Sequence, residues 1–127
     1  MRRTGLGLAL PAAFALVLLG LQAAEADPLP TIVGTCTETT IEEVGTRLGT
    51  PDSGSVVSFD NGGVQISYDP VPGIIHSQAG DPVNVCLVFV PEDCPPGDDR
   101  GKIYRTTNLR TGESWELPDS QHSCGGA

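Results

Sequence analysis

The sequence predicts an all-β domain: a small antiparallel β-sandwich or barrel of about six strands, stabilised by disulfides and preceded by an N-terminal signal peptide. Three observations support this fold class. Short runs of β-branched and aromatic residues alternate with turn residues about every eight to twelve positions. The chain carries four cysteines. After the first segment, no long stretch has convincing helical periodicity.

The first segment has the organisation of an export signal. Arg2 and Arg3 supply positive charge, an apolar run extends from Leu6 to Leu21, and Ala24-Glu25-Ala26 has the small-x-small pattern that signal peptidases cleave. The apolar run is shorter than the roughly 20 residues that a membrane span needs, and it contains a proline. We therefore expect residues 1–26 to be removed.

The remaining residues, 27–127, are enough for a single secreted β domain with a thin core. Export places the four cysteines in an oxidising compartment, so we expect two disulfides, each contributing roughly 2–4 kcal/mol. Three pairings are possible. We favour Cys86–Cys94 with Cys36–Cys124, which would close a short loop and clasp the two ends of the domain. The pairing Cys36–Cys86 with Cys94–Cys124 is nearly as well supported.

The N-terminal half of the domain predicts one bulged strand and one hairpin. Thr37–Leu48 has some helical spacing, but its many β-branched residues and an internal glycine favour a bulged strand. Ser55–Asp60 and Val64–Asp69 flank Asn61-Gly62-Gly63, a sequence that favours a tight hairpin turn. In the second run, alternate apolar residues are expected to form the buried face, namely Val64, Ile66 and Tyr68.

The C-terminal half predicts a central strand and a second hairpin. Val83–Val90 is apolar on both faces for most of its length, so we expect a strand covered on both sides. Before it, Ile74 and Ile75 are expected to pin a loop onto the core. Lys102–Thr107 and Glu113–Leu117 are expected to pair around a turn. Aromatic residues are scarce and are therefore expected in the core: Phe59, Tyr68, Phe89, Tyr104 and Trp115.

The charge of the chain limits its partners. The net charge is −9, and loss of two arginines and one glutamate with the signal makes it −10. Nucleic acids and anionic membrane surfaces are bound through clustered Lys and Arg, so we expect neither as partner, and no membrane span after signal cleavage. The charge would keep the domain soluble, and it suits a cationic partner such as a basic protein or an envelope component.

The loop Pro91–Gly101 is the strongest candidate for a binding surface, because loops on a rigid scaffold commonly make such contacts. We predict its tip at Asp98, Asp99 and Arg100. A calcium site is an alternative, since Ca²⁺ prefers clustered carboxylates and loop carbonyls. The spacing is not that of an EF-hand, and a solvated turn explains the same residues. We therefore predict no metal and no cofactor.

Catalytic motifs are absent from the sequence. No serine lies in a Gly-x-Ser-x-Gly elbow, and the cysteines that could pair with His76 or His122 are expected to be oxidised. Glu42 and Glu43 are adjacent, so on a regular strand they would face opposite sides and could not act together. We expect no enzymatic activity. A small hydrolase with an unrecognised site remains the alternative.

Three segments carry a resemblance: Gly80-Asp81-Pro82-Val83, Cys94-Pro95-Pro96-Gly97-Asp98-Asp99-Arg100-Gly101 and Leu117-Pro118-Asp119-Ser120-Gln121-His122. With these segments the chain resembles a family of small exported proteins of Gram-negative bacteria that has no assigned activity. The likeness covers most of residues 27–127 and implies export and shared cysteines. In size, compartment and acidity the chain is also similar to periplasmic lysozyme inhibitors, which are compact disulfide-bonded β-barrels.

Together these features predict a non-catalytic exported binding or accessory domain of the cell envelope, periplasmic or secreted. An inhibitor of a cationic cell-wall hydrolase such as lysozyme is a second prediction.

Overall fold

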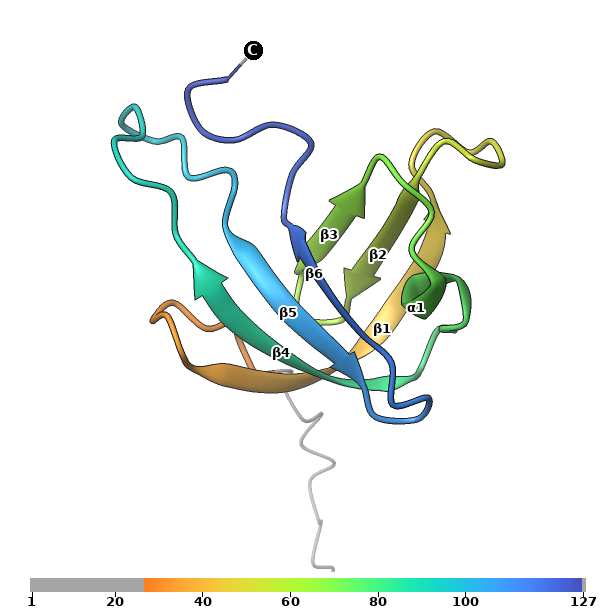
Figure 1. Cartoon of the computed structure of the whole chain (residues 1–127). Helices are drawn as coiled ribbons and strands as arrows, with labels where there is room; N and C mark the ends of the chain where they lie inside the picture. The colour runs from red at the N-terminus through yellow and green to blue at the C-terminus, as the bar shows by residue number, and fades with distance from the viewer. Residues whose placement is uncertain (1–26, 127) are drawn as a thin grey trace, which may run out of the picture.

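The computed structural model describes residues 27–126, which form one six-stranded antiparallel sheet curled into a half-barrel (Figure 1). The predicted all-β class is confirmed. The signal peptide predicted at residues 1–26 lies outside the described residues. The order of the strands across the sheet is β3-β2-β1-β4-β5-β6. The elements are β1 (Cys36–Thr46), β2 (Ser55–Phe59), β3 (Val64–Ser67), the one-turn helix α1 (Pro72–Ile75), β4 (Pro82–Phe89), β5 (Ile103–Asn108) and β6 (Ser114–Pro118).

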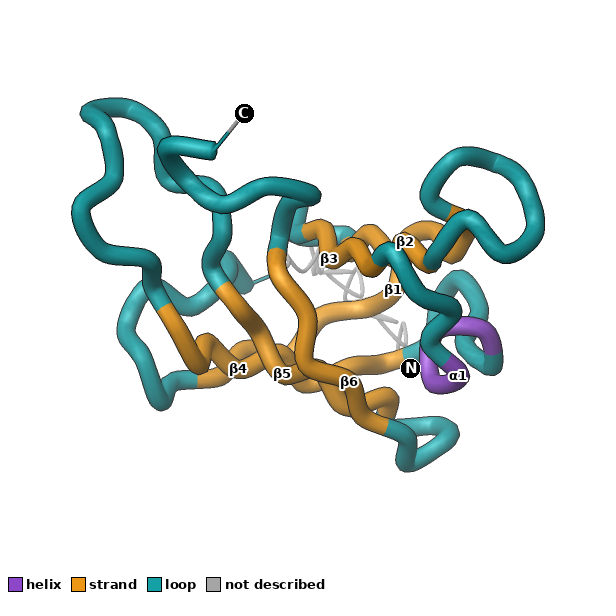
Figure 2. Tube along the Cα trace, turned by 45° about the horizontal axis from the view of Figure 1, so that its top comes forward, coloured by secondary structure: helices purple, strands orange, loops and turns teal. Residues whose placement is uncertain are grey.

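Strand β1 is long enough to serve both halves of the sheet. Its first part, Cys36–Thr40, pairs with β4, and its second part, Ile41–Thr46, pairs with β2. A bulge between Ile41 and Glu43 separates the two parts. Bulges bend a strand and increase its twist, so this position curls the sheet, and the predicted bulged strand is confirmed. Figure 2 shows the result: β3 and β6, the outer strands, approach each other across the open side, with α1 at one end.

The core lies inside the half-barrel and draws on every strand except β3, as well as on α1. Its buried apolar residues are Ile41, Val57, Phe59, Ile74, Val83, Val85, Leu87, Tyr104 and Trp115. Ile74 is fully buried, as expected, whereas Ile75 beside it is 59% exposed.

The expectation that Val83–Val90 is covered on both sides is wrong. Only its inward residues are buried, and Phe89 on the other side is 48% exposed. A half-barrel has one interior, and within residues 27–126 no second layer covers the convex face. The apolar outward residues of β4 therefore contribute to the surface.

The hairpin around Asn61-Gly62-Gly63 is confirmed, but its predicted buried face is wrong. Gln65 points inward and is 1% exposed, whereas Val64 is 39% and Tyr68 52% exposed. The side chain of Arg47 covers the ring of Tyr68, with the guanidinium carbon 4.4 Å from the ring centroid. Residue polarity alone predicts the wrong buried face for β3. The inward position of Gln65 lies beside β5 and β6, which offer hydrogen-bonding groups to its side-chain amide.

The two disulfides are Cys36–Cys86 and Cys94–Cys124. The favoured pairing of Cys86 with Cys94 is wrong, and the alternative is correct. Register decides the first bond, because Cys36 and Cys86 lie directly opposite each other on β1 and β4. The second bond fixes the C-terminal tail to the loop that follows β4. The second predicted hairpin, β5–β6, is confirmed.

Candidate functional site

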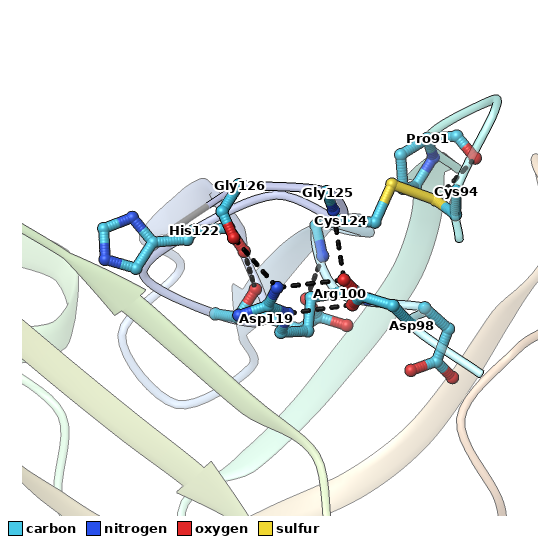
Figure 3. A network of polar contacts seen from close by, with 12 residues as sticks. Pro91, Cys94, Asp98, Arg100, Asp119, His122, Cys124, Gly125 and Gly126 are labelled. Carbon is cyan, nitrogen blue, oxygen red and sulfur yellow. Dashed lines mark hydrogen bonds and ion pairs between the residues drawn. A yellow bond between two sulfur atoms is a disulfide. The ribbon is translucent and has the colours of Figure 1, made fainter. Parts of the chain in front are cut away.

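The loop Pro91–Gly101 and the tail Pro118–Gly126 form one structure, which we call the loop–tail clasp (Figure 3). Arg100 donates two hydrogen bonds to the carboxylate of Asp98, at 2.8 and 2.9 Å. The amide of Gly125 donates to the same carboxylate at 3.0 Å, and Arg100 donates to the carbonyl of Gly126 at 3.2 Å. The ion pair thus connects the loop with the end of the tail.

Backbone hydrogen bonds complete the clasp. The amide of Cys124 donates to the carbonyl of Arg100 at 2.8 Å, and the amide of Gly101 donates to the carboxylate of Asp119 at 2.8 Å. Gly101 adopts a φ of +104°, and a Cβ atom there would approach the backbone of Ser123 to 3.0 Å. A side chain at this position would push the tail away from the loop.

The three residues predicted at the loop tip lie in the clasp and have internal partners. Hydrogen bonds from Arg100, followed by that from Gly125, hold the pKa of the Asp98 carboxyl well below its usual range. Asp99 is paired with Lys102 at 3.4 Å, but its side chain is 84% exposed. Of the three, Asp99 is the one most available to another molecule. Contact with a partner at this tip stays a prediction.

A second polar network lies at the opposite end of the sheet and is centred on Asp81, whose side chain is 4% exposed. Its carboxylate accepts hydrogen bonds from Arg110 at 2.6 and 2.9 Å, from Asn108 at 2.9 Å and from the amide of Gln78 at 2.9 Å. The Arg110 bond is the main reason why the pKa of Asp81 lies well below its usual range. The network joins the loop before β4 to the turn after β5.

The two histidines that a hydrolase would need, His76 and His122, are not assembled into a triad. His76 lies 3.0 Å from Glu113, which gives it a carboxylate partner. Within residues 27–126, no serine hydroxyl hydrogen bonds to the ring of His76 or His122. In the same part of the chain, no group of three His, Cys, Asp or Glu side chains is arranged to hold a metal ion, which includes the predicted alternative site in the acidic loop.

The bulge in β1 creates an arrangement that the sequence argument missed. Glu42 and Glu43 are both exposed, although on a regular strand one of them would face inward. The bulge changes the alternation at this point, and Glu38 is exposed nearer the start of the strand. We call these three residues the β1 carboxylates. The mixed helix and strand pattern of this segment was the one signal in the sequence for such an irregularity.

Every Lys and Arg in the described part of the chain has an internal partner. Arg100, Lys102, Arg105 and Arg110 form ion pairs with Asp98, Asp99, Glu116 and Asp81 respectively, and Arg47 covers Tyr68. Apart from these four acids and the Glu113 partner of His76, the carboxylates of residues 27–126 form no ion pair, the β1 carboxylates among them.

A mostly apolar depression lies where the end of β1 meets α1, with Val44, Pro70, Ile74 and Ile75 among its lining residues. It has no charged group converging on it apart from Asp52 at its rim, so it offers little to orient a polar ligand. No helix in residues 27–126 is both long and apolar enough to span a membrane.

In comparisons with known proteins, no family model, no curated protein and no solved structure matches the chain. The two disulfides are typical of proteins that work outside the reducing cytosol.

Proposed function

We propose that this protein is a non-catalytic exported binding or accessory domain of the cell envelope, periplasmic or secreted, whose partner presents a basic surface. Removal of residues 1–26 would release the domain into a compartment where both disulfides persist.

The distribution of charge carries this proposal. The Lys and Arg side chains of the described residues all have partners within the same chain. The β1 carboxylates Glu38, Glu42 and Glu43, in contrast, are exposed on one strand and form no ion pair among the described residues. A surplus of free negative charge on a rigid strand accelerates encounter with a cationic partner and repels anionic ones.

Binding to a basic cell-wall hydrolase tests the proposal directly. Purified residues 27–127 are titrated against lysozyme by calorimetry at low and at high salt. We expect binding that weakens as salt screens the charges. Replacing the three β1 carboxylates by glutamine should weaken binding roughly 3- to 150-fold, because three exposed ion pairs at about 0.2–1 kcal/mol each contribute about 0.6–3 kcal/mol together.

A matched triple variant controls for net charge. Asp52→Asn, Asp69→Asn and Glu92→Gln remove the same number of exposed negative charges from other parts of the surface. If both triple variants weaken binding equally, the surface assignment is wrong. If lysozyme does not bind at micromolar protein and low salt, the lysozyme partner is wrong as well.

Cell-wall lysis then separates an inhibitor from a simple binder. An inhibitor slows lysis by lysozyme in proportion to the bound fraction, and the β1 triple variant loses this effect. If lysis is unchanged at saturating protein, the protein binds lysozyme without inhibiting it, and the inhibitor prediction is wrong.

A further inference from the structure

We infer that Cys36–Cys86 is an exchange-competent disulfide that oxidises a dithiol protein, whereas Cys94–Cys124 is structural. This inference does not depend on the basic partner proposed above, since it rests on a different part of the molecule.

The two disulfides differ in what they connect. Cys36 and Cys86 are opposite residues on the paired strands β1 and β4, next to the hydrogen bond from the amide of Leu87 to the carbonyl of Thr35. Cys94 and Cys124 instead connect a loop with the tail. The first bond therefore joins two segments that the sheet already holds together.

The usual spacing of opposite residues in an antiparallel sheet is wider than the Cys36–Cys86 disulfide allows. Opposite residues in an antiparallel pair have Cα atoms at least about 4.5 Å apart and Cβ atoms about 4.5–5.5 Å apart, whereas a disulfide places the Cβ atoms about 3.8 Å apart. The Cα atoms of Cys36 and Cys86 lie 4.0 Å apart, against 5.3 Å for Cys94 and Cys124. Reduction would let β1 and β4 return to ordinary spacing with their ladder intact, so it requires no unfolding.

Access favours attack on Cys36. Cys36 is exposed at the start of β1, and Cys86 is half-buried on the same convex face. Because no second layer covers this face within the described residues, a partner can approach Cys36 from solvent.

The neighbours of Cys86 favour it as the leaving group. The side-chain amide of Asn84 donates to the Cys86 sulfur at 3.5 Å, an interaction that strengthens when the sulfur becomes a thiolate. The charged neighbours are Glu38, opposite Asn84 on β1, and Arg105, opposite Cys86 on β5. Arg105 is in turn bound to Glu116 on β6 at 2.8 Å.

The exchange balances in two steps. A partner thiolate attacks the Cys36 sulfur, which forms a mixed disulfide and releases Cys86 as a thiolate. The second thiolate of the partner then attacks the partner's own sulfur in that mixed disulfide and releases Cys36. The partner leaves with a disulfide, and this protein has gained two electrons and, after protonation, carries two thiols. The required reductant is a protein dithiol of the Cys-x-x-Cys class.

Graded reduction tests the inference on oxidised residues 27–127. The protein is treated with dithiothreitol, quenched with N-ethylmaleimide, and mapped by mass spectrometry, while circular dichroism reports folding. We expect Cys36 and Cys86 to be labelled at least tenfold faster than Cys94 and Cys124, with the β spectrum unchanged. Equal rates, earlier labelling of Cys94 and Cys124, or labelling only on unfolding would each overturn the inference.

Two variants test the leaving group, and the second disulfide serves as the internal control. Asn84→Ala should slow reduction of Cys36–Cys86 several-fold and raise the pKa of the Cys86 thiol, measured from the pH dependence of its alkylation. Asn84→Asp should slow it further, because a negative charge opposes the thiolate. Neither variant should change the rate at Cys94–Cys124; unchanged rates at Cys36–Cys86 would show that Asn84 has no part in the exchange.

A trapping experiment tests the direction of attack. A thioredoxin-type protein whose second active-site cysteine is replaced by serine cannot complete the exchange, so the mixed disulfide accumulates. We expect it at Cys36; a mixed disulfide at Cys86 would reverse the assigned direction, and one at Cys94 or Cys124 would overturn the inference.

Discussion

Asp81 is the clearest case of a single residue whose role depends on distant parts of the chain. Its buried carboxylate collects hydrogen bonds from Arg110, Asn108 and the amide of Gln78. Asn108 is itself fully buried and also donates to the hydroxyl of Ser77 at 2.8 Å. Loss of the carboxylate charge would leave these donors poorly satisfied, which is costly in a buried site.

We predict that Asp81→Asn lowers the free energy of unfolding by about 2 kcal/mol at pH 7, since breaking a buried ion pair is costly and the exposure of Arg110 reduces that cost. Urea unfolding followed by the fluorescence of Trp115, the one tryptophan of the chain, measures it. The exposed Asp52→Asn variant is the control and should change stability by less than about 0.5 kcal/mol.

The same variant has a defined pH dependence. The pKa of Asp81 is lowered in the folded state, so its contribution is complete above the ordinary aspartate pKa of about 4 and is lost as the pH falls below that value. The stability difference between wild type and Asp81→Asn should therefore stay constant above about pH 5 and shrink progressively as the pH falls from about 4 to 2. A constant difference would show that the charge of Asp81 is not what stabilises the fold.

Asp81 lies in the loop that precedes β4. The sequence did not predict its ion pair, because Arg110 lies 29 positions away and no local pattern links the two. The clasp shows the same limit: the predicted tip residues Asp98 and Arg100 are two positions apart in one loop, but their tail partners, Gly125 and Gly126, are evident only in the folded chain.

Among the elements, β3 depends most on one polar side chain. The amide of Gln65 donates to the carbonyl of Tyr104 at 2.8 Å and to that of Leu117 at 3.0 Å. Its oxygen accepts from the hydroxyl of Thr106 at 2.5 Å and from the indole of Trp115 at 2.9 Å. Gln65 thereby connects β3 to β5 and β6 across the open side of the half-barrel.

We predict that Gln65→Leu lowers the free energy of unfolding by about 2–4 kcal/mol, because it leaves several buried groups without hydrogen bonds. Urea unfolding and amide hydrogen exchange in β3 and β6 measure the effect. Val64→Thr, at an outward position of the same strand, is the control and should cost less than about 1 kcal/mol. If Gln65→Leu is as stable as wild type, the hydrogen bonds of Gln65 do not hold the half-barrel closed.

Hairpins were predictable because turn chemistry is local, as Asn61-Gly62-Gly63 shows. Facing was less so. An isolated alternation of Val64, Gln65 and Ile66 favours the apolar residues inside, and the opposite outcome depends on carbonyl groups contributed by other strands. The residues of β1 predicted a bulge but not its position at Glu42 and Glu43, which depends on where β1 changes its pairing from β4 to β2.

For the molecule as a whole, Cys94–Cys124 limits the freedom of the C-terminal tail. The bond spans 30 residues of sequence, and the chain-entropy model assigns such a loop about 3–4 kcal/mol of stabilisation. We predict that the double variant Cys94→Ser, Cys124→Ser loses about this amount, measured by urea unfolding.

Limited proteolysis locates that loss. The tail should become sensitive to cleavage before the rest of the domain, and Arg100→Ala in the double variant should increase this sensitivity because it removes the remaining ion pair to the tail. Uniform sensitivity along the chain would contradict a local role for the clasp.

The number of strands, and their ends to within about two residues, followed from the sequence, whereas the cysteine pairing did not. Cys86 and Cys94 are close in sequence and looked like natural partners. Cys36 faces Cys86 across the β1–β4 pairing, however, and the tail brings Cys124 to Cys94 in the loop after β4, so the choice depends on register and on the path of the tail.

The close approach of β3 to β6 affects how this protein behaves at high concentration. A flat sheet exposes a border of unpaired amides and carbonyls along which foreign strands can assemble. Here the free edges of β3 and β6 face each other. The side-chain amide of Gln65 also donates a hydrogen bond to one carbonyl of the β6 edge, that of Leu117. A domain closed in this way would thus resist fibrous association for as long as β3 and β6 stay together.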